Sequence, residues 1–196
     1  MKDSINQTIR ISLLGDTTVG KTSIKNVYLG EKFSEDMLLT AAIHKEEKIV
    51  ELNNGNKIIA KIWDTAGQEK FRSMVLQTLK NGQGIVLVFD VTKRETFNGL
   101  KSWLDDINKI TTKVKIILFG NKCDADDDVR AVTEEEAKQF ANENNILYIE
   151  TSAKENVNIE KGFSQIINDT YAKYGATAGF ALKKREMKET DVADYN

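Results

Sequence analysis

The sequence of 196 residues predicts an α/β protein with a mostly parallel sheet. Apolar, strand-like runs alternate with amphipathic, helix-like segments along most of the chain, a pattern typical of parallel strands joined by crossover helices. Two runs, 84–90 and 114–120, are apolar throughout and therefore suit strands that are buried on both faces. A glycine-bounded turn over residues 15–22 separates the first strand from the first helix. Together these observations predict a six-stranded sheet covered on both faces by about five helices.

Each predicted element follows from its local pattern. Strands are expected over residues 9–14, 43–52, 57–64, 84–90, 114–120 and 146–150. Helices are expected over residues 21–29, 96–110, 133–144 and 157–174. The turn signal Asn53-Asn54-Gly55 joins the second and third strands as a hairpin, so the sheet should contain one antiparallel strand. Thr133 and Glu136 have the spacing of a capping box at the start of a helix.

The composition is that of a single folded domain. We expect this domain over residues 1–174, followed by a polar, aperiodic tail or linker over residues 175–196. The net charge of −2 gives no argument for a nucleic-acid partner, and no apolar run is long enough to cross a bilayer. The single cysteine, Cys123, excludes an intrachain disulfide, and the N-terminus does not resemble a signal peptide. We therefore expect a cytoplasmic protein that is a monomer.

Residues 15–22, GDTTVGKT, fit the phosphate-binding pattern G-x-x-x-x-G-K-[ST]. In this pattern, backbone N–H groups and the N-terminus of the following helix hold phosphate oxygens. Lys21 would reach the β- and γ-phosphates, and the hydroxyl of Thr22 would bind Mg²⁺. A purely structural turn between a strand and a helix is the alternative. The residues expected to contact a nucleotide here are Asp16, Thr17, Thr18, Val19, Gly20, Lys21, Thr22 and Ser23.

The strand over residues 57–64 ends at Asp64, and Thr65-Ala66-Gly67-Gln68 follows it. An acidic residue in this place can be a simple turn former. Beside a phosphate-binding loop, it better suits an aspartate that helps to hold Mg²⁺, here through water. The N–H of Gly67 would then reach the γ-phosphate, and the amide of Gln68 would position an attacking water.

A second group of polar residues, Asn121, Lys122 and Asp124, follows the strand over residues 114–120. The carboxylate of Asp124 can accept hydrogen bonds from the ring N–H and the exocyclic amine of guanine, and adenine has neither donor in that place. Sites built on such bonds discriminate by about 10⁴–10⁵. An ordinary polar loop is the alternative. Ser152, Ala153 and Lys154 close the last strand, where their backbone N–H groups can reach the same base.

The four motifs GDTTVGKT, WDTAGQE, NKCD and ETSAK, in this order and at these distances, resemble those of the Ras-superfamily small GTPases. The resemblance covers residues 8–174, and residues 61–73 and 129–137 are most similar to Rab sequences. It implies a P-loop NTPase fold of the small G domain type. It also implies a molecular switch that binds GTP and GDP with Mg²⁺, hydrolyses GTP slowly and acts in vesicle trafficking. Its partners would be an exchange factor, a GTPase-activating protein and effectors.

The same resemblance assigns roles to single residues. Phe33 falls where the family packs an aromatic ring against guanine. Thr40 falls where the first switch segment binds Mg²⁺ and the γ-phosphate, and Gln68 falls on the catalytic glutamine of the second. With Lys21, Gln68 would therefore form the catalytic pair. The metal ligands would be Thr22, Thr40 and, through water, Asp64.

The chain departs from the Rab pattern where Rabs bind their effectors. Ala41-Ala42-Ile43-His44-Lys45 replaces the usual Ile-Gly-Val-Asp-Phe, and Thr78-Leu79 replaces a later aromatic pair. Only Trp63 remains of the apolar effector patch, so ordinary Rab effectors should bind poorly. The chain also lacks a cysteine near residue 196 that could be prenylated. Association with the cytosolic face of a membrane would therefore need a segment absent from this chain.

Thr17 and Thr18 stand where many relatives have glycine or serine, and their side chains should crowd the γ-phosphate. We therefore expect slow intrinsic hydrolysis. A divergent guanine-nucleotide-binding interaction module with little hydrolysis is an open alternative, although Gln68 and Thr40 are both retained. An ATP-using kinase with a phosphate-binding loop fits less well, because the motif ending at Asp124 selects guanine.

Overall fold

A computed structural model of the chain describes residues 7–34, 43–65, 72–79 and 82–190, without the side chains of residues 74, 78 and 176–190. The strands form one six-stranded sheet in the order β2-β3-β1-β4-β5-β6. β2 is antiparallel to β3 and all other neighbours are parallel, as predicted. The strands are β1 (Thr8–Leu14), β2 (His44–Glu51), β3 (Lys57–Asp64), β4 (Gly84–Asp90), β5 (Lys115–Asn121) and β6 (Leu147–Thr151).

The helices lie between these strands in the chain. They are α1 (Lys21–Tyr28), α2 (Arg72–Thr78), α3 (Arg94–Asn98), α4 (Leu100–Ile110), α5 (Glu134–Glu143) and α6 (Ile159–Thr190). Gly99, between α3 and α4, has helical backbone angles, so these two helices correspond to the single helix predicted over residues 96–110. The hydroxyl of Thr133 accepts a hydrogen bond from the N–H of Glu136, which confirms the predicted cap of α5.

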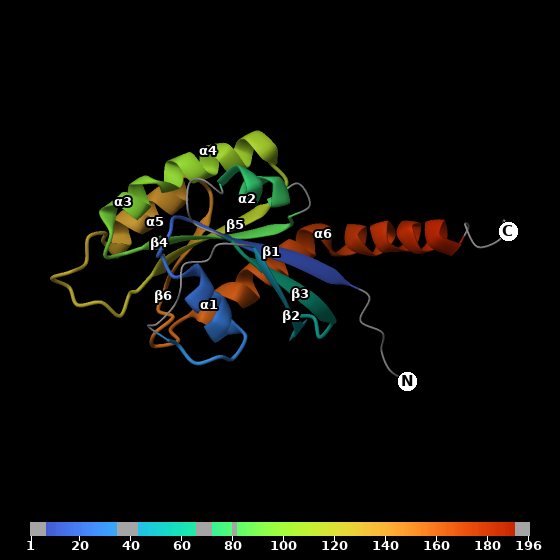
Figure 1. Cartoon of the computed structure of the whole chain (residues 1–196), viewed down its shortest axis with the longest axis horizontal. Coiled ribbons are helices and arrows are strands. Elements are labelled where there is room, and N and C mark those ends of the chain that lie inside the picture. The colour runs from blue at the N-terminus through green and yellow to red at the C-terminus, as the bar shows by residue number, and fades with distance from the viewer. Residues whose placement is uncertain (1–6, 35–42, 66–71, 80–81, 191–196) are drawn as a thin grey trace.

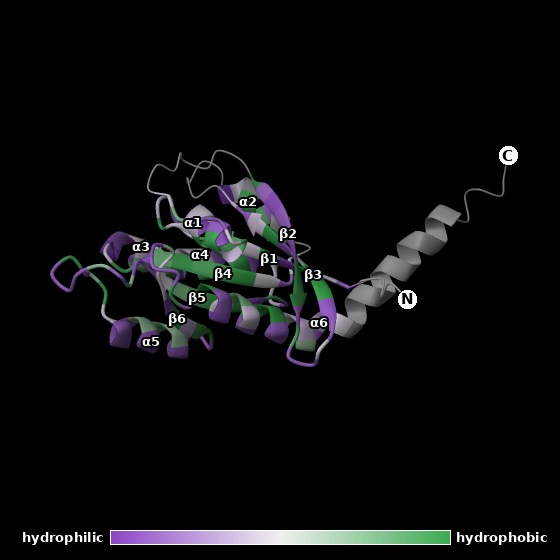
Figure 2. Ribbon diagram, turned by 90° about the horizontal axis from the view of Figure 1, so that it is seen from below, coloured by the Kyte–Doolittle hydropathy of each residue, from purple (hydrophilic) through white to green (hydrophobic). Residues whose placement is uncertain are grey.

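The sheet is covered on both faces. Figure 1 shows α1 and α6 on one face and α2, α3, α4 and α5 on the other. Each helical layer encloses its own apolar core against the sheet, one around Ile24 and Phe163, the other around Leu87 and Trp103. All seven residues of β4 are buried, so the apolar side chains of this strand contribute to both cores, one on each face of the sheet. In Figure 2 the central strands are accordingly hydrophobic, while α5 turns hydrophilic residues outward.

The ring of Phe163 on α6 is the central contact of the first core. It stacks on Tyr28 of α1, with 3.8 Å between ring centroids and 14° between planes. It also meets the ring of Phe119 of β5 edge-on, at 6.1 Å. Phe163 is fully buried, so both helices and the sheet depend on this one side chain.

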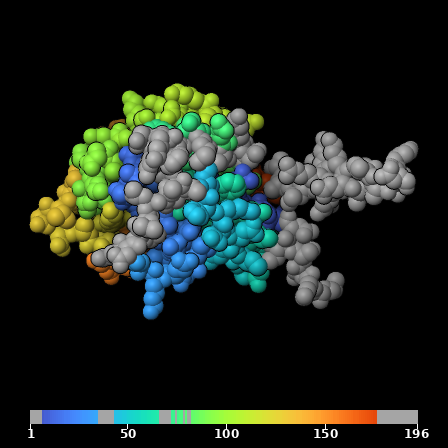
Figure 3. Space-filling view, in the orientation of Figure 1, coloured from blue at the N-terminus to red at the C-terminus, as the bar shows by residue number. Residues whose placement is uncertain are grey.

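The hairpin of β2 and β3 is fastened to α1 and α6 on the first face. The ammonium of Lys48 lies 3.9 Å above the ring of Tyr28 and pairs with Glu160 at 3.0 Å. At the turn, the N–H of Asn53 donates to Asn168 at 3.0 Å, and the side-chain amide of Asn56 donates to Tyr171 at 3.2 Å. In Figure 3, the hairpin (cyan) accordingly lies beside α1 (blue) at the surface.

The sequence placed the end of the last helix too early. The predicted boundary at residue 174 is not an end of secondary structure, because α6 continues to Thr190. Residues 175–190 lack the apolar period that predicts a packed helix, yet they are rich in alanine, lysine and glutamate, which favour helix without any packing face. Of the described helices, none is long and apolar enough to cross a membrane.

We predict that Phe163→Ala lowers the free energy of unfolding by about 3–5 kcal/mol, because it removes a buried ring that joins α1, α6 and β5. Urea unfolding would measure this change. Phe140→Ala is the matched control, since Phe140 lies only partly buried on α5 and should cost clearly less. Equal losses for the two variants would contradict the central place of Phe163.

Candidate functional site

The candidate site lies at the edge of the sheet where the parallel strands end. Asp64, Asp90, Asn121 and Thr151 are the last residues of β3, β4, β5 and β6. The register aligns them, because Asp90 pairs with Asn121, Asn121 pairs with Thr151, and Asp64 pairs with Leu13 near the end of β1. Ligands of open α/β sheets bind outside this carboxyl edge.

The loop between β1 and α1 depends on two glycines. Gly15 has a φ of +137°, and a Cβ there would lie 2.1 Å from the carbonyl oxygen of Val88. Gly20 has a φ of +97°, and a Cβ there would lie 2.3 Å from the side-chain nitrogen of Asn121. No side chain fits at either position, so the loop lies directly against β4 and Asn121.

Lys21 is buried at the start of α1, with 5% of its surface exposed. Its ammonium donates to the carbonyl oxygens of Gly15 at 2.8 Å and Asp16 at 2.6 Å, so it lies inside the loop. Burial lowers the pKa of Lys21 to about 8, against the opposing attraction of Asp64 and Asp16. A buried cation of this kind is stabilised by an anion, and the N-terminus of α1 beside it also favours an anion.

Asp64 and Thr22 form the part of the site that suits a metal ion. The hydroxyl of Thr22 donates to Oδ2 of Asp64 at 2.7 Å. Asp64 is fully buried, and its other oxygen, Oδ1, has no hydrogen-bond partner among the described residues. Burial raises the pKa of Asp64, against the hydrogen bond from Thr22 and the charges of Lys25 and Lys21. A hydroxyl beside a carboxylate with an open oxygen fits Mg²⁺ and its bound water.

The described residues contain no cluster of three or more His, Cys, Asp or Glu that could hold a metal ion by itself. Mg²⁺ at Thr22 would therefore take further oxygens from phosphate and water, as Mg²⁺ commonly does in nucleotide sites. Thr40, Gly67 and Gln68, which the sequence assigns to the metal, the γ-phosphate and the attacking water, lie outside the described residues.

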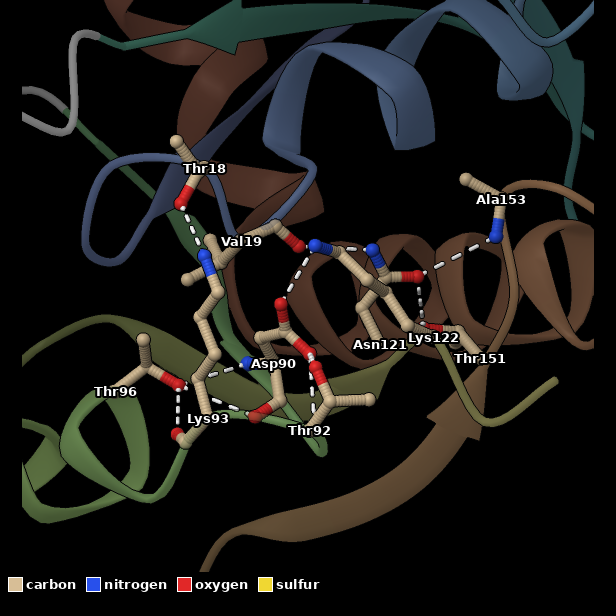
Figure 4. Close-up of polar contacts among 10 residues, drawn as sticks. All are labelled: Thr18, Val19, Asp90, Thr92, Lys93, Thr96, Asn121, Lys122, Thr151 and Ala153. Carbon is tan, nitrogen blue, oxygen red and sulfur yellow. Dashed lines mark hydrogen bonds and ion pairs between the residues drawn. The ribbon is translucent and has the colours of Figure 1, made fainter. Parts of the chain in front are cut away.

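The side-chain amide of Asn121 joins three loops, as Figure 4 shows. Its nitrogen donates to the carbonyl oxygen of Val19 at 2.8 Å. Its oxygen accepts from the N–H of Ala153 at 3.3 Å and from the hydroxyl of Thr151 at 3.4 Å. The loop of residues 15–20 is thus held against the loops that follow β5 and β6.

The residues expected around a base lie near this amide. Asp124 is exposed, whereas Ser152 and Ala153 are buried. A cleft with a volume of about 540 Å³ is lined by Phe33, Ala153 and Lys154 among others. Phe33 is half-buried and packs against the first core, so it forms one wall of this cleft. The structure therefore brings together Phe33 and Lys154, which the sequence places 121 positions apart.

The comparison with known sequences agrees with this arrangement. The sequence model of the Ras family matches residues 10–172. The chain belongs to the Ras family. The Ras-related protein RABA5b of Arabidopsis thaliana is 36% identical over 163 residues, covering 83% of this chain and 74% of that protein. RABA4d of the same plant is 36% identical over 193 residues, covering 98% and 83%. Rab-10 of Diplobatis ommata is 37% identical over 191 residues, covering 97% and 89%.

These relatives make the chain a Rab-like small GTPase of the Ras superfamily, a GTP-binding protein that hydrolyses GTP. The fold predicted from the four motifs, a small G domain, is confirmed by the family match and by the sheet. The α/β prediction and the resemblance to Rabs therefore both hold.

Three residues of this GTPase that contact the predicted site were missed from the sequence: Asp90, Lys93 and Trp103. The carboxylate of Asp90 lies 2.6 Å from the ammonium of Lys122, and the indole N–H of Trp103 on α4 donates to the carboxylate of Asp16 at 2.8 Å. Asp90 carries a usable signal, because it closes an apolar strand as Asp64 does. No pattern links Trp103 to Asp16, which lies 87 positions earlier in the sequence.

The face of β2 and β3 that carries Trp63, the residue left of the Rab effector patch, is charged in this GTPase. Lys45 pairs with Glu47 at 3.1 Å, and Lys61 pairs with the same carboxylate at 3.3 Å. Trp63 lies opposite Lys45 in the register, and the guanidinium of Arg10 lies 4.4 Å from the centre of its ring. The aromatic residue that remains is thus covered in part by a cation.

We predict that Asn121→Ala weakens GDP binding about a hundredfold, because the carbonyl of Val19 and the N–H of Ala153 both lose a buried partner. Calorimetric titration of the nucleotide-free GTPase with GDP would measure the affinity. Asn144→Ala is the control, since Asn144 is exposed at the end of α5 and its side-chain amide donates to the carbonyl oxygen of Phe140. Unchanged affinity in Asn121→Ala would show that the loops hold their places without this amide.

Proposed function

We propose that this chain is a GTP-dependent molecular switch whose nucleotide and Mg²⁺ bind at the carboxyl edge of the sheet. The bridge made by Asn121 is the observation that carries the proposal. It joins the phosphate-binding loop to the loops that carry Asp124 and Ala153. A phosphate cradle and a guanine-selective loop held together in this way form one site rather than two unrelated turns.

The phosphates would lie in the loop of residues 15–22, against the backbone N–H groups of Asp16 to Thr22 and near Ser23. The buried ammonium of Lys21 would exchange its carbonyl partners for phosphate oxygens. Their negative charge would favour the protonated form of Lys21. Thr22 and Asp64 would hold Mg²⁺ together with Thr40 of the first switch segment. When bound, Mg²⁺ would neutralise the charge on the phosphate oxygens.

The guanine base would lie between Phe33 and Lys154, with Asp124 accepting from its two donors. Lys122 and the backbone N–H groups of Ser152 and Ala153 would complete the pocket. Adenine offers neither donor to Asp124, and sites built on such hydrogen bonds discriminate by about 10⁴–10⁵.

Hydrolysis would depend on positioning and charge rather than on a covalent step. Gln68 would orient the attacking water, and Lys21 would stabilise charge on the phosphate that is transferred. Ras itself hydrolyses GTP unaided at a rate on the order of 10⁻⁴ s⁻¹. We expect this chain to be as slow or slower, because Thr17 and Thr18 both carry exposed side chains at the phosphate loop.

The cellular role that fits a Rab-like switch is vesicle trafficking. GTP and Mg²⁺ would hold the switch segments, and hydrolysis would release them. An exchange factor and a GTPase-activating protein would drive the cycle of this monomeric, cytoplasmic domain of residues 1–174. The charged face of Lys45, Glu47 and Lys61 favours effectors other than those that bind an aromatic Rab patch.

One observation favours a second candidate function, a guanine-nucleotide-binding module that hydrolyses little. Thr18 has a φ of +63° and its hydroxyl accepts a hydrogen bond from Lys93 at 3.2 Å, so the loop is bound to Lys93 by a side chain that glycine would not provide. A module of this kind would bind partners according to the nucleotide while rarely changing state.

We predict that GDP and GTP, but not ATP, displace a fluorescent guanine nucleotide from the protein, with a difference of at least about a thousandfold in the concentration needed. Asp124→Ala should reduce this difference, because the carboxylate no longer selects guanine. Asp126→Ala, which removes an exposed carboxylate two residues later, serves as the control. Displacement by ATP at the concentration that suffices for GDP would overturn the guanine assignment.

We predict that Thr17→Gly raises the rate of single-turnover GTP cleavage about tenfold, which corresponds to about 1.4 kcal/mol in the barrier. The reason is that glycine removes a side chain that crowds the γ-phosphate. Thr112→Gly, in the exposed loop after α4, controls for the general effect of an added glycine. Equal cleavage rates for wild type and Thr17→Gly would remove the steric explanation. If both rates are also near zero, the result would favour the guanine-nucleotide-binding module that hydrolyses little.

A further inference from the structure

The carboxylate of Asp90 is buried at the end of β4 and faces the guanine motif. Oδ2 lies 2.6 Å from the ammonium of Lys122, whose side chain is 39% exposed, whereas that of Asp90 is fully buried. Oδ1 accepts from the N–H of Thr92 at 2.9 Å and from its hydroxyl at 2.7 Å. Because both oxygens have partners, the carboxylate has one orientation, and the ion pair holds Lys122 in one place.

Three residues later, Lys93 reaches the phosphate loop. Its ammonium donates to the hydroxyl of Thr18 at 3.2 Å. Its backbone is fixed, because its N–H donates to the carbonyl of Asp90 at 3.0 Å and its own carbonyl accepts from the hydroxyl of Thr96 at 2.8 Å. Figure 4 shows the two lysines on either side of this turn, with Lys93 directed to Thr18 and Lys122 to Asp90.

Thr18 is the phosphate-loop residue whose conformation most needs support. Its φ of +63° lies in the left-handed region, which is costly for a β-branched side chain. The residue is exposed, so core packing does not hold it there. Strained backbone of this kind persists only where neighbouring groups stabilise it. The hydrogen bond from Lys93 is such a contact.

We propose that the turn of residues 90–96 is a positioning element for the guanine nucleotide. Lys93 positions Thr18 of the phosphate loop, and Asp90 positions Lys122 of the guanine motif. The proposal rests on the nucleotide site proposed above and adds residues that lie outside its four motifs. The turn thus holds the phosphate loop through the bond from Lys93 to Thr18 and the guanine motif through the ion pair of Asp90 with Lys122. Release of the nucleotide requires at least one of these two bonds to break. The turn therefore sets how long GDP stays bound.

The test is the rate at which fluorescent GDP leaves the Mg²⁺-containing complex in an excess of unlabelled GDP. Asp90→Asn keeps the acceptor for Thr92 and removes the charge that holds Lys122, and should speed release about tenfold. Lys93→Met keeps the side-chain stem and removes the ammonium, and should speed release about threefold. Lys93→Arg, which restores a donor, should return the rate to near that of wild type. Lys138→Met, which breaks a surface pair with Glu134 on α5, is the control and should change nothing.

A second comparison separates positioning from a general loss of structure. In a Thr18→Ala background, Lys93→Met should produce no further increase, because Lys93 acts through the hydroxyl that is already gone. Thermal unfolding of the nucleotide-free proteins should give midpoints for Lys93→Met and Lys138→Met that agree. Release from Lys93→Met within about twofold of wild type, or an equal effect of Lys93→Met in both backgrounds, would overturn the proposal.

The outcome also distinguishes this proposal from the one on which it rests. If the wild-type protein does not retain GDP, the guanine-nucleotide site itself is wrong. If the wild type retains GDP and Asp90→Asn and Lys93→Met release it at the wild-type rate, only the role of the turn is wrong. Should Asp90→Asn fold poorly, Thr92→Val removes one donor to the same carboxylate and should speed release in the same direction.

Discussion

The site depends on the side-chain amide of Asn121. A primary amide carries a donor and an acceptor on one short, rigid group, and here they satisfy the carbonyl of Val19 and the N–H of Ala153. An aspartate would lack the donor and an alanine would lack both groups. The amide also explains Gly20, because any Cβ at that position would collide with it. Three loops that are distant in the sequence therefore share one buried partner, and none can move far without leaving a polar group unpaired.

Two buried charges of the site have opposite sign and the same cause for their altered pKa values. Burial lowers the pKa of Lys21 and raises the pKa of Asp64, so the folded protein carries charges that water would stabilise better. A triphosphate matches the first charge and a hydrated divalent cation matches the second. Burying these two charged groups costs free energy, and interactions with the bound ligands offset that cost. Ligand binding should therefore raise the free energy of unfolding.

The sequence was informative wherever a local pattern decides the structure. β3 and β4 have the predicted bounds because apolar runs, turn residues and terminal acids all act locally, and the four motifs predicted the family that the comparison then showed. The bonds of Asp90 to Lys122 and of Lys93 to Thr18 were not predicted, because side-chain directions across 32 and 75 positions have no periodic signature. The end of α6 was missed because helix propensity without an apolar face gives no packing signal. The roles of the site residues, Thr40 and Gln68 among them, remain predictions.

The contacts of Lys48, Asn53 and Asn56 make the β2–β3 hairpin an arm that is anchored at its tip. Its turn is fixed to α6 and its middle to α1, while its other end leads to Asp64 at the nucleotide edge. A change of nucleotide must then be taken up near Asp64, and the tip keeps its position. A protein that binds the tip would bind the GDP and GTP forms of this GTPase equally. Only a protein that binds the end of the hairpin near Asp64 would distinguish the two forms.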